Sequence, residues 1–320
     1  MASRLQLESI LKRVALGVVL LLAVSVAIFA GTEMLPGDVA QVILGQSATP
    51  QAVANLRHEL GLDRPAYARY LEWAWRLLHG DWGVSLTSGR DIAEMLAGRL
   101  ANTLFLAGSA ALLSVPLALL LGMLSAMFAE RWVDRTISTA TIAIVSLPEF
   151  FVGYVVMLCF AVLWPVMPAN SIVYPGMPLA ERLSGIALPA ATLIVVSLAQ
   201  MMRMTRAAIL NVMSMPYIEM AKLKGAGRVR IVFRHAFPNA ASPIVTVILL
   251  NLAALVVGVV VVEVVFVYPG MGQLMVDHVA KRDVPVVQAA GLIFAATYVV
   301  LNTCADVVAV LTNPRLRHPG

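Results

Sequence analysis

The sequence predicts an all-α integral membrane protein with six transmembrane helices. Hydrophobic residues make up 60% of its 320 residues and charged residues only 13%, whereas a soluble domain carries about 25% charged residues. The mean hydropathy is +0.86, and the apolar residues gather into long runs. Lipid offers backbone N–H and C=O groups no partner, so runs that cross a membrane are expected to be helical.

Six runs have the length of about 20 mostly apolar residues that a spanning helix needs. The third run is interrupted only by Glu149, and the first resembles a secretory signal because Lys12 and Arg13 precede it. The length of that first run and the spans after it favour an uncleaved helix. The six predicted spans are residues 14–30, 100–129, 136–163, 183–202, 236–262 and 284–305.

Basic residues in the short loops predict the orientation. The loop after the fourth span carries seven bases against one acid, Glu219. The N-terminal tail carries three bases against Glu8. Because Lys and Arg are enriched in cytoplasmic loops, both termini and this loop are expected in the cytoplasm. The seven bases of the loop are Arg203, Arg206, Lys222, Lys224, Arg228, Arg230 and Arg234.

The predicted organisation has four parts: a tail with the first helix (1–30), an external segment (31–94), a five-helix membrane domain (95–311) and a cytoplasmic tail (312–320). In the external segment, Thr49 followed by Pro50 predicts a helix start. This helix places Val53, Leu56 and Leu60 on one face and ends at Gly61. A second helix, ending at Gly80, places Tyr70, Trp73, Ala74 and Leu77 on one side. The segment is either a structural cap or a docking face for a soluble partner.

Sequence signatures of chemistry are absent. The chain has no P-loop, no His-Glu-x-x-His and no Gly-x-Ser-x-Gly, so we expect no catalytic residue, no bound cofactor and no ATPase activity in this chain. Cys159 and Cys304 lie inside apolar runs without Cys/His clustering, which disfavours a metal or redox site. The net charge of +5 follows the membrane topology, and nucleic acid is not an expected partner.

Three acids lie in or near the spans. Carboxylates inside a membrane are costly and are candidates for function by default. Glu149, beside Pro148, either touches a translocation path or lies at a water-exposed end. Glu263 is expected to order the loop at Pro269, and Asp306 to pair with a nearby Arg.

The basic loop at 214–239 is longer than a connection between two spans requires. Residues 217–224 predict a short helix with Ile218, Ala221 and Leu223 as candidate contacts, and Gly225 and Gly227 allow a sharp exit. A second segment, 228–237, stops at Pro238. Binding to anionic lipid headgroups would explain the positive charge of the loop but not the spacing of its residues. A partner subunit that presses on the loop would explain both the charge and the Glu-Met-Ala-x-x-x-Gly spacing.

The loop sequence EMAKLKG at 219–225 resembles the Glu-Ala-Ala-x-x-x-Gly loop of ABC-importer permeases. The similarity extends over almost the whole chain and is closest to permease subunits of the dipeptide/oligopeptide/nickel class. Met220 departs from the usual alanine. The other matching segments are LPGD (35–38), ELGLDRP (59–65), GDWGVSL (80–86), SLP (146–148), RHA (234–236), VEVVF (262–266), PGMG (269–272) and RDVPVVQ (282–288).

The resemblance implies a type I ABC importer permease fold with a cytoplasmic coupling helix, in a bacterial inner membrane. It implies a second, similar permease, two cytoplasmic ATP-binding subunits and an extracytoplasmic solute-binding protein as partners, besides membrane lipid. Small peptides are the implied cargo; nickel chelates, glutathione and sugar-like conjugates are alternatives. The residues that would engage the ATPase are Tyr217, Glu219, Met220, Ala221, Lys224, Gly225 and Arg228.

An ion-coupled secondary carrier is the alternative from another class. Such carriers show inverted repeats and binding groups near the membrane midplane. The sequence shows no clear repeat, and its acids lie near the ends of spans.

Overall fold

The computed structural model describes residues 2–34, 37–174 and 176–312 and is helical, with one isolated β-bridge between Val84 and Asp91. Residues 35 and 36 of the LPGD segment and residues 313–320 of the predicted tail lie outside the described residues. The chain divides into two compact units. The first contains residues 1–18, 104–268 and 297–320, and the second contains residues 19–103 and 269–296.

Long apolar helices account for all six predicted spans, so the predicted fold class is confirmed. Among the described residues, five helices are long and apolar enough to cross a membrane, and a bent pair makes six. The five are α1 (Ala2–Glu33), α5 (Ile92–Met127), α9 (Ala187–Met213), α12 (Phe237–Val265) and α14 (Val284–Thr312). The bent pair is α6 (Trp132–Val145) with α7 (Glu149–Met157), which continues as the π-helical η2 (Leu158–Leu163).

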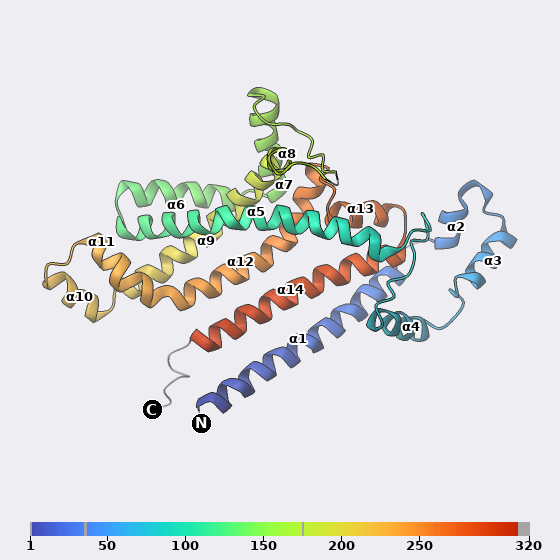
Figure 1. The fold of residues 1–320 in the computed structure, drawn as a ribbon, viewed down its shortest axis with the longest axis horizontal. Coiled ribbons are helices and arrows are strands. Elements are labelled where there is room, and N and C mark those ends of the chain that lie inside the picture. The colour runs from blue at the N-terminus through green and yellow to red at the C-terminus, as the bar shows by residue number, and fades with distance from the viewer. Residues whose placement is uncertain (1, 35–36, 175, 313–320) are drawn as a thin grey trace. The chain divides into compact units, whose positions relative to one another are not determined.

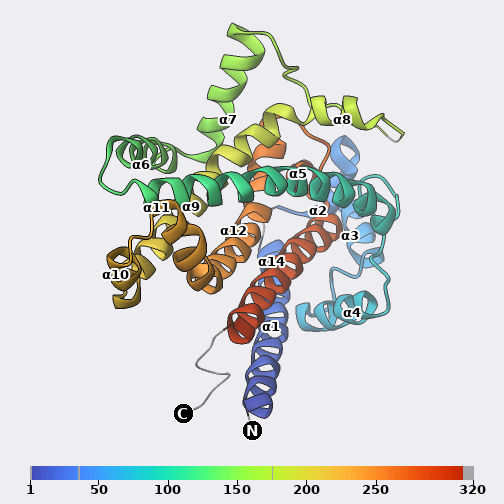
Figure 2. The same ribbon diagram turned by 60° about the vertical axis from the view of Figure 1, so that its left-hand side comes forward.

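The third predicted span is broken. The directions of α6 and α7 differ by 105°, as Figure 2 shows. Proline disfavours helical backbone in the residue before it and cannot donate a backbone hydrogen bond, so α6 ends ahead of Pro148. This break makes Glu149 the first residue of α7.

In the first unit, α9 packs along α12, and α6 and α7 pack against α9 (Figure 1). One buried cluster lies between α5, α9 and α12 and includes Leu106, Leu193 and Val259. A second surrounds Ile209, Val232 and Ile244. The shorter helices of this unit are α8 (Leu179–Gly185), α10 (Pro216–Leu223), α11 (Arg228–Arg230) and the π-helical η3 (Ile231–Ala236).

The second unit contains the helices of the predicted external segment. These are α2 (Val39–Leu44), η1 (Gly45–Ser47), α3 (Pro50–Glu59) and α4 (Ala66–Leu78), with α13 (Met271–Ala280). The predicted helix start is confirmed, because Thr49 Oγ1 accepts a hydrogen bond of 3.2 Å from Ala52 N. The residues predicted to share one face of each of these two helices, α3 and α4, are all half-buried.

One buried aspartate anchors the second unit. Asp283 is fully buried just before α14. Its carboxylate accepts hydrogen bonds from Ser85 Oγ (2.5 Å) and Thr87 Oγ1 (2.7 Å). It also accepts from the backbone amides of Leu86 (3.1 Å) and Thr87 (3.2 Å). The segment that follows α4 is thereby tied to the start of α14.

Candidate functional site: a coupling loop and a polar cavity

The loop between α9 and α12 forms the predicted short helix. Pro216 occupies the first turn of α10, where its missing N–H costs nothing. Of the eight residues of α10, all of them described, Ile218 alone is buried. A single apolar side chain therefore holds α10 on the unit, while the rest of the helix remains available.

The exit from α10 is a Schellman turn. Ala226 N donates to Ala221 O (3.1 Å) and Gly225 N donates to Lys222 O (2.9 Å), the two bonds that define this helix ending. Gly225 has φ +80°, where a Cβ is disfavoured. Gly227 has φ −67°, which any residue adopts, so only Gly225 is needed for the turn.

The predicted coupling residues lie on the exposed side of this loop. Tyr217 is 43% and Met220 55% exposed, and Ala221 is half-buried. Leu223 was a candidate packing contact, but it is 80% exposed. Figure 1 shows α10 and α11 at the end of α9 opposite α8. We call the following set of exposed side chains the coupling surface: Tyr217, Glu219, Met220, Lys222, Leu223, Lys224 and Arg228.

The basic side chains of the coupling surface have no acidic partner within the described part of the chain. Lys222, Lys224 and Arg228 form no ion pair there. Exposed apolar side chains beside unpaired bases are typical of a surface that binds a partner.

A buried ion pair ties α6 to α9 two turns before α9 ends. Asp134 is 3% exposed, and its two oxygens accept from Arg206 Nε and Nη2, each at 2.7 Å. Ser125 Oγ and the backbone N of Glu130 also donate to this carboxylate. A bidentate pair of this kind fixes geometry as well as charge.

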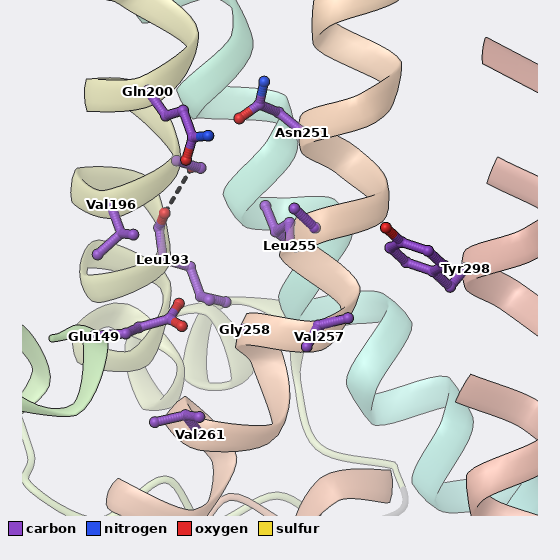
Figure 3. Close-up of a pocket in the computed structure, with 12 residues that line it drawn as sticks. Glu149, Leu193, Val196, Gln200, Asn251, Leu255, Val257, Gly258, Val261 and Tyr298 are labelled. Carbon is purple, nitrogen blue, oxygen red and sulfur yellow. Dashed lines mark hydrogen bonds between the residues drawn. The ribbon is translucent and has the colours of Figure 1, made fainter. Parts of the chain in front are cut away.

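The first unit also contains a cavity of about 430 Å³ (Figure 3). Its walls come from α7, α9, α12 and α14 and are largely apolar, with Leu193, Val196 and Val261 among them. The polar side chains that line it are Glu149, Ser197, Gln200, Asn251 and Tyr298.

Glu149 points from α7 across the cavity toward Gly258 of α12 (Figure 3). A Cβ added at Gly258 would lie 2.5 Å from Glu149 Oε1 and 2.9 Å from Oε2. Because glycine has no side chain, Gly258 leaves room for the carboxylate of Glu149. Because Glu149 follows the bend, it lies between the two arms of the bent helix pair.

Sequence reasoning missed several of these residues. Asp134 and Arg206 were counted only as loop charges, although they form the buried pair. Gly258 was one glycine in an apolar run, and nothing in the sequence pairs it with Glu149. The prediction that Asp306 pairs with an Arg is confirmed by its 2.6 Å contact with Arg13.

Comparison with known proteins identifies the family. Residues 118–318 match the model of the binding-protein-dependent transport system inner membrane component, and residues 6–107 match the N-terminal model of the corresponding membrane component. Together these matches cover nearly the whole chain.

Relatives of similar length share about a third of their residues with this chain. The probable peptide ABC transporter permease protein y4tP of Sinorhizobium fredii is 35% identical over 97% of this chain and 99% of its own length. A putative peptide transport system permease protein of Brucella abortus is 33% identical over 97% and 98%. The glutathione transport system permease protein GsiC of Salmonella choleraesuis is 34% identical over 98% and 99%.

The helical spans agree with the matched family models. The chain therefore belongs to the family of inner membrane components of binding-protein-dependent transport systems and is a multi-pass permease subunit of an ABC importer, not its ATPase.

Proposed function

We propose that this permease carries small peptides or related solutes inward by alternating access, driven by ATP hydrolysis in separate subunits. The observation that carries the proposal is the coupling surface, an exposed basic and apolar face held by Ile218 and a glycine turn. Peptide-like cargo is supported by the names of the relatives, which include peptide and glutathione permeases.

The proposed assembly contains a second, similar permease, two cytoplasmic ATP-binding subunits and an extracytoplasmic solute-binding protein. Both termini and the coupling surface would face the cytoplasm, consistent with the basic residues of that loop. Since the chain has no P-loop, nucleotide would be bound by the partner subunits, and we propose no cofactor in this chain.

Membrane lipid would contact the external segment through α4. Tyr67 and Trp75 are 71% and 65% exposed, and Leu71 between them is 62% exposed. Tyr and Trp favour the headgroup level of a bilayer, so this exposed stripe suits the membrane surface.

The ion pair offers a route for movement from the coupling surface into the unit. The short α10 follows α9 directly, and Arg206 near the end of α9 is fixed to Asp134 at the start of α6. A push on α10 would therefore move α9 and α6 together toward the bend before Glu149. Two states of this connected element, favoured differently by ATP and by solute, would give alternating access.

Substitution of Gly225 tests the proposal, with Gly227 as the matched control. A side chain at φ +80° costs about 1–2 kcal/mol, and Gly225→Arg also adds bulk where the ATPase would sit. We expect Gly225→Arg to release the ATP-binding subunits or to uncouple ATP hydrolysis from uptake, while Gly227→Ala, at an ordinary φ, retains both.

Co-purification in gentle detergent and ATP-driven uptake in proteoliposomes measure the two effects. Normal uptake by the Gly225→Arg complex would refute the coupling assignment. Solute transport by the purified chain alone, driven only by an ion gradient, would favour the secondary-carrier alternative.

A further inference from the structure

The carboxylate of Glu149 has no partner among the described residues of the chain. No ion pair or hydrogen bond of the described structure includes it, whereas Arg206 neutralises Asp134 and four donors satisfy Asp283. In the first turn of α7, the amides of Phe151 and Val152 bond to Pro148 O and not to the carboxylate of Glu149.

The other polar side chains that line the cavity, Ser197, Gln200, Asn251 and Tyr298, are uncharged. Ser197 Oγ donates to Leu193 O (2.6 Å), the dashed line in Figure 3. Asn251 Nδ2 donates to Val247 O (2.9 Å), which leaves its amide oxygen for another donor. In Figure 3 the side-chain amides of Gln200 and Asn251 face one another across the space.

Among the described residues, no basic side chain lines the cavity, so none of them balances the negative charge of Glu149 from within it. A carboxylate facing largely apolar walls is stabilised by a cation that brings its own hydrogen-bond donors. A primary ammonium group has three such donors and no acceptor. The volume of about 430 Å³ lies within the range of small-molecule sites.

The geometry points to a subsite for the ammonium group of a solute in transit. We propose that Glu149 binds a free amino group of the cargo, at the end of the cavity where its carboxylate faces Gly258. The permease itself would thus prefer solutes with a free amine, in addition to any selection by the solute-binding protein. This inference rests on the proposed function and names the class of cargo.

Binding to the assembled transporter tests the subsite without the solute-binding protein. The complex of both permeases and the ATP-binding subunits is placed in nanodiscs without nucleotide, and equilibrium binding of radiolabelled dialanine and N-acetyl-dialanine is measured. Hydrogen bonds to charged groups are worth enough to change affinity by about tenfold or more. We therefore expect at least about tenfold tighter binding of dialanine by the wild type.

Two variants in the cavity should abolish this preference. Glu149→Gln removes the charge and keeps the shape. Gly258→Ala places a methyl group where the carboxylate lies, and the flexible end of Glu149 must move aside. Asp306→Asn is the matched control, because this carboxylate lies in the same unit but pairs with Arg13 outside the cavity. It should retain the preference.

Equal affinity of the wild type for the two probes would overturn the proposal, and so would unchanged dialanine preference in Glu149→Gln. Absence of dialanine binding to the wild type at millimolar concentration would also overturn it. ATP-driven uptake of dialanine by the wild-type complex, measured with the solute-binding protein present, distinguishes a failure of the subsite proposal from a failure of the proposed function. Uptake with no effect of Glu149→Gln on binding refutes the subsite alone, whereas no uptake of any peptide refutes the proposed function.

Discussion

Two buried aspartates, one in each unit, are satisfied in different ways. Asp134 faces a cation, since Arg206 donates two hydrogen bonds to it. Asp283 instead accepts hydrogen bonds from four neutral donors of the described chain, two hydroxyls and two backbone amides around Ser85 and Thr87. The first arrangement joins two long helices, and the second fastens a loop to the start of a helix.

The comparison separates structural carboxylates from a functional one. A buried charge is tolerated where it is paired or fully hydrogen-bonded, and both aspartates meet this condition. Glu149 does not meet it from within the described chain. The difference indicates that the aspartates hold the fold, and it is the observation on which the proposed ammonium subsite at Glu149 rests.

Breaking the Asp134 pair should have the largest effect on stability. Asp134→Ala leaves the Arg206 cation without its carboxylate, and because the Arg206 side chain is 29% exposed, the cost should lie near about 3 kcal/mol, the lower end for buried pairs. Thermal unfolding of the purified complex measures the loss. Asp306→Ala is the control, because its pair with Arg13 is half-exposed, with side chains 51% and 38% exposed, and such pairs contribute about 0–1 kcal/mol. Equal losses in the two variants would contradict the structural role of Asp134.

Asp283→Asn should have an intermediate effect confined to the second unit. The amide nitrogen that replaces one oxygen cannot accept from the backbone amides of Leu86 or Thr87, and such a loss costs about 1.5–3 kcal/mol. Hydrogen exchange over residues 84–91 should become faster. Asp63→Asn, at an aspartate with a 52% exposed side chain, should leave this exchange unchanged. Unaltered exchange in Asp283→Asn would show that the loop is held by other contacts.

Glu149→Gln should cause the smallest loss of stability, or none, because no partner among the described residues is lost and an unpaired charge facing apolar walls is removed. The same variant should impair uptake while the amount of assembled complex is unchanged. Thermal unfolding and uptake measured on one preparation check both statements. A large loss of stability, or normal uptake, would place Glu149 with the structural carboxylates.

The sequence predicted elements whose signals are local. The apolar runs predicted six spans, the hydroxyl and proline at 49–50 predicted the start of α3, and the EMAKLKG segment predicted α10 with its exposed side chains. It also assigned the turn to Gly225, and wrongly added Gly227, because two neighbouring glycines look alike until their φ angles are known. Leu223 was expected to pack but is exposed, since the period of a helix does not say which side has a neighbour.

By itself, the sequence determined that this chain spans a membrane, carries a short basic helix after the fourth span and resembles importer permeases, because hydropathy, charge and short motifs act over neighbouring residues. Only the tertiary structure decided which charges meet. Asp134 and Arg206 are 72 residues apart, and Ser85 and Asp283 are 198 apart. The 105° bend and the absent side chain of Gly258 turn Glu149 into the cavity, and both act through packing between helices that no local pattern encodes.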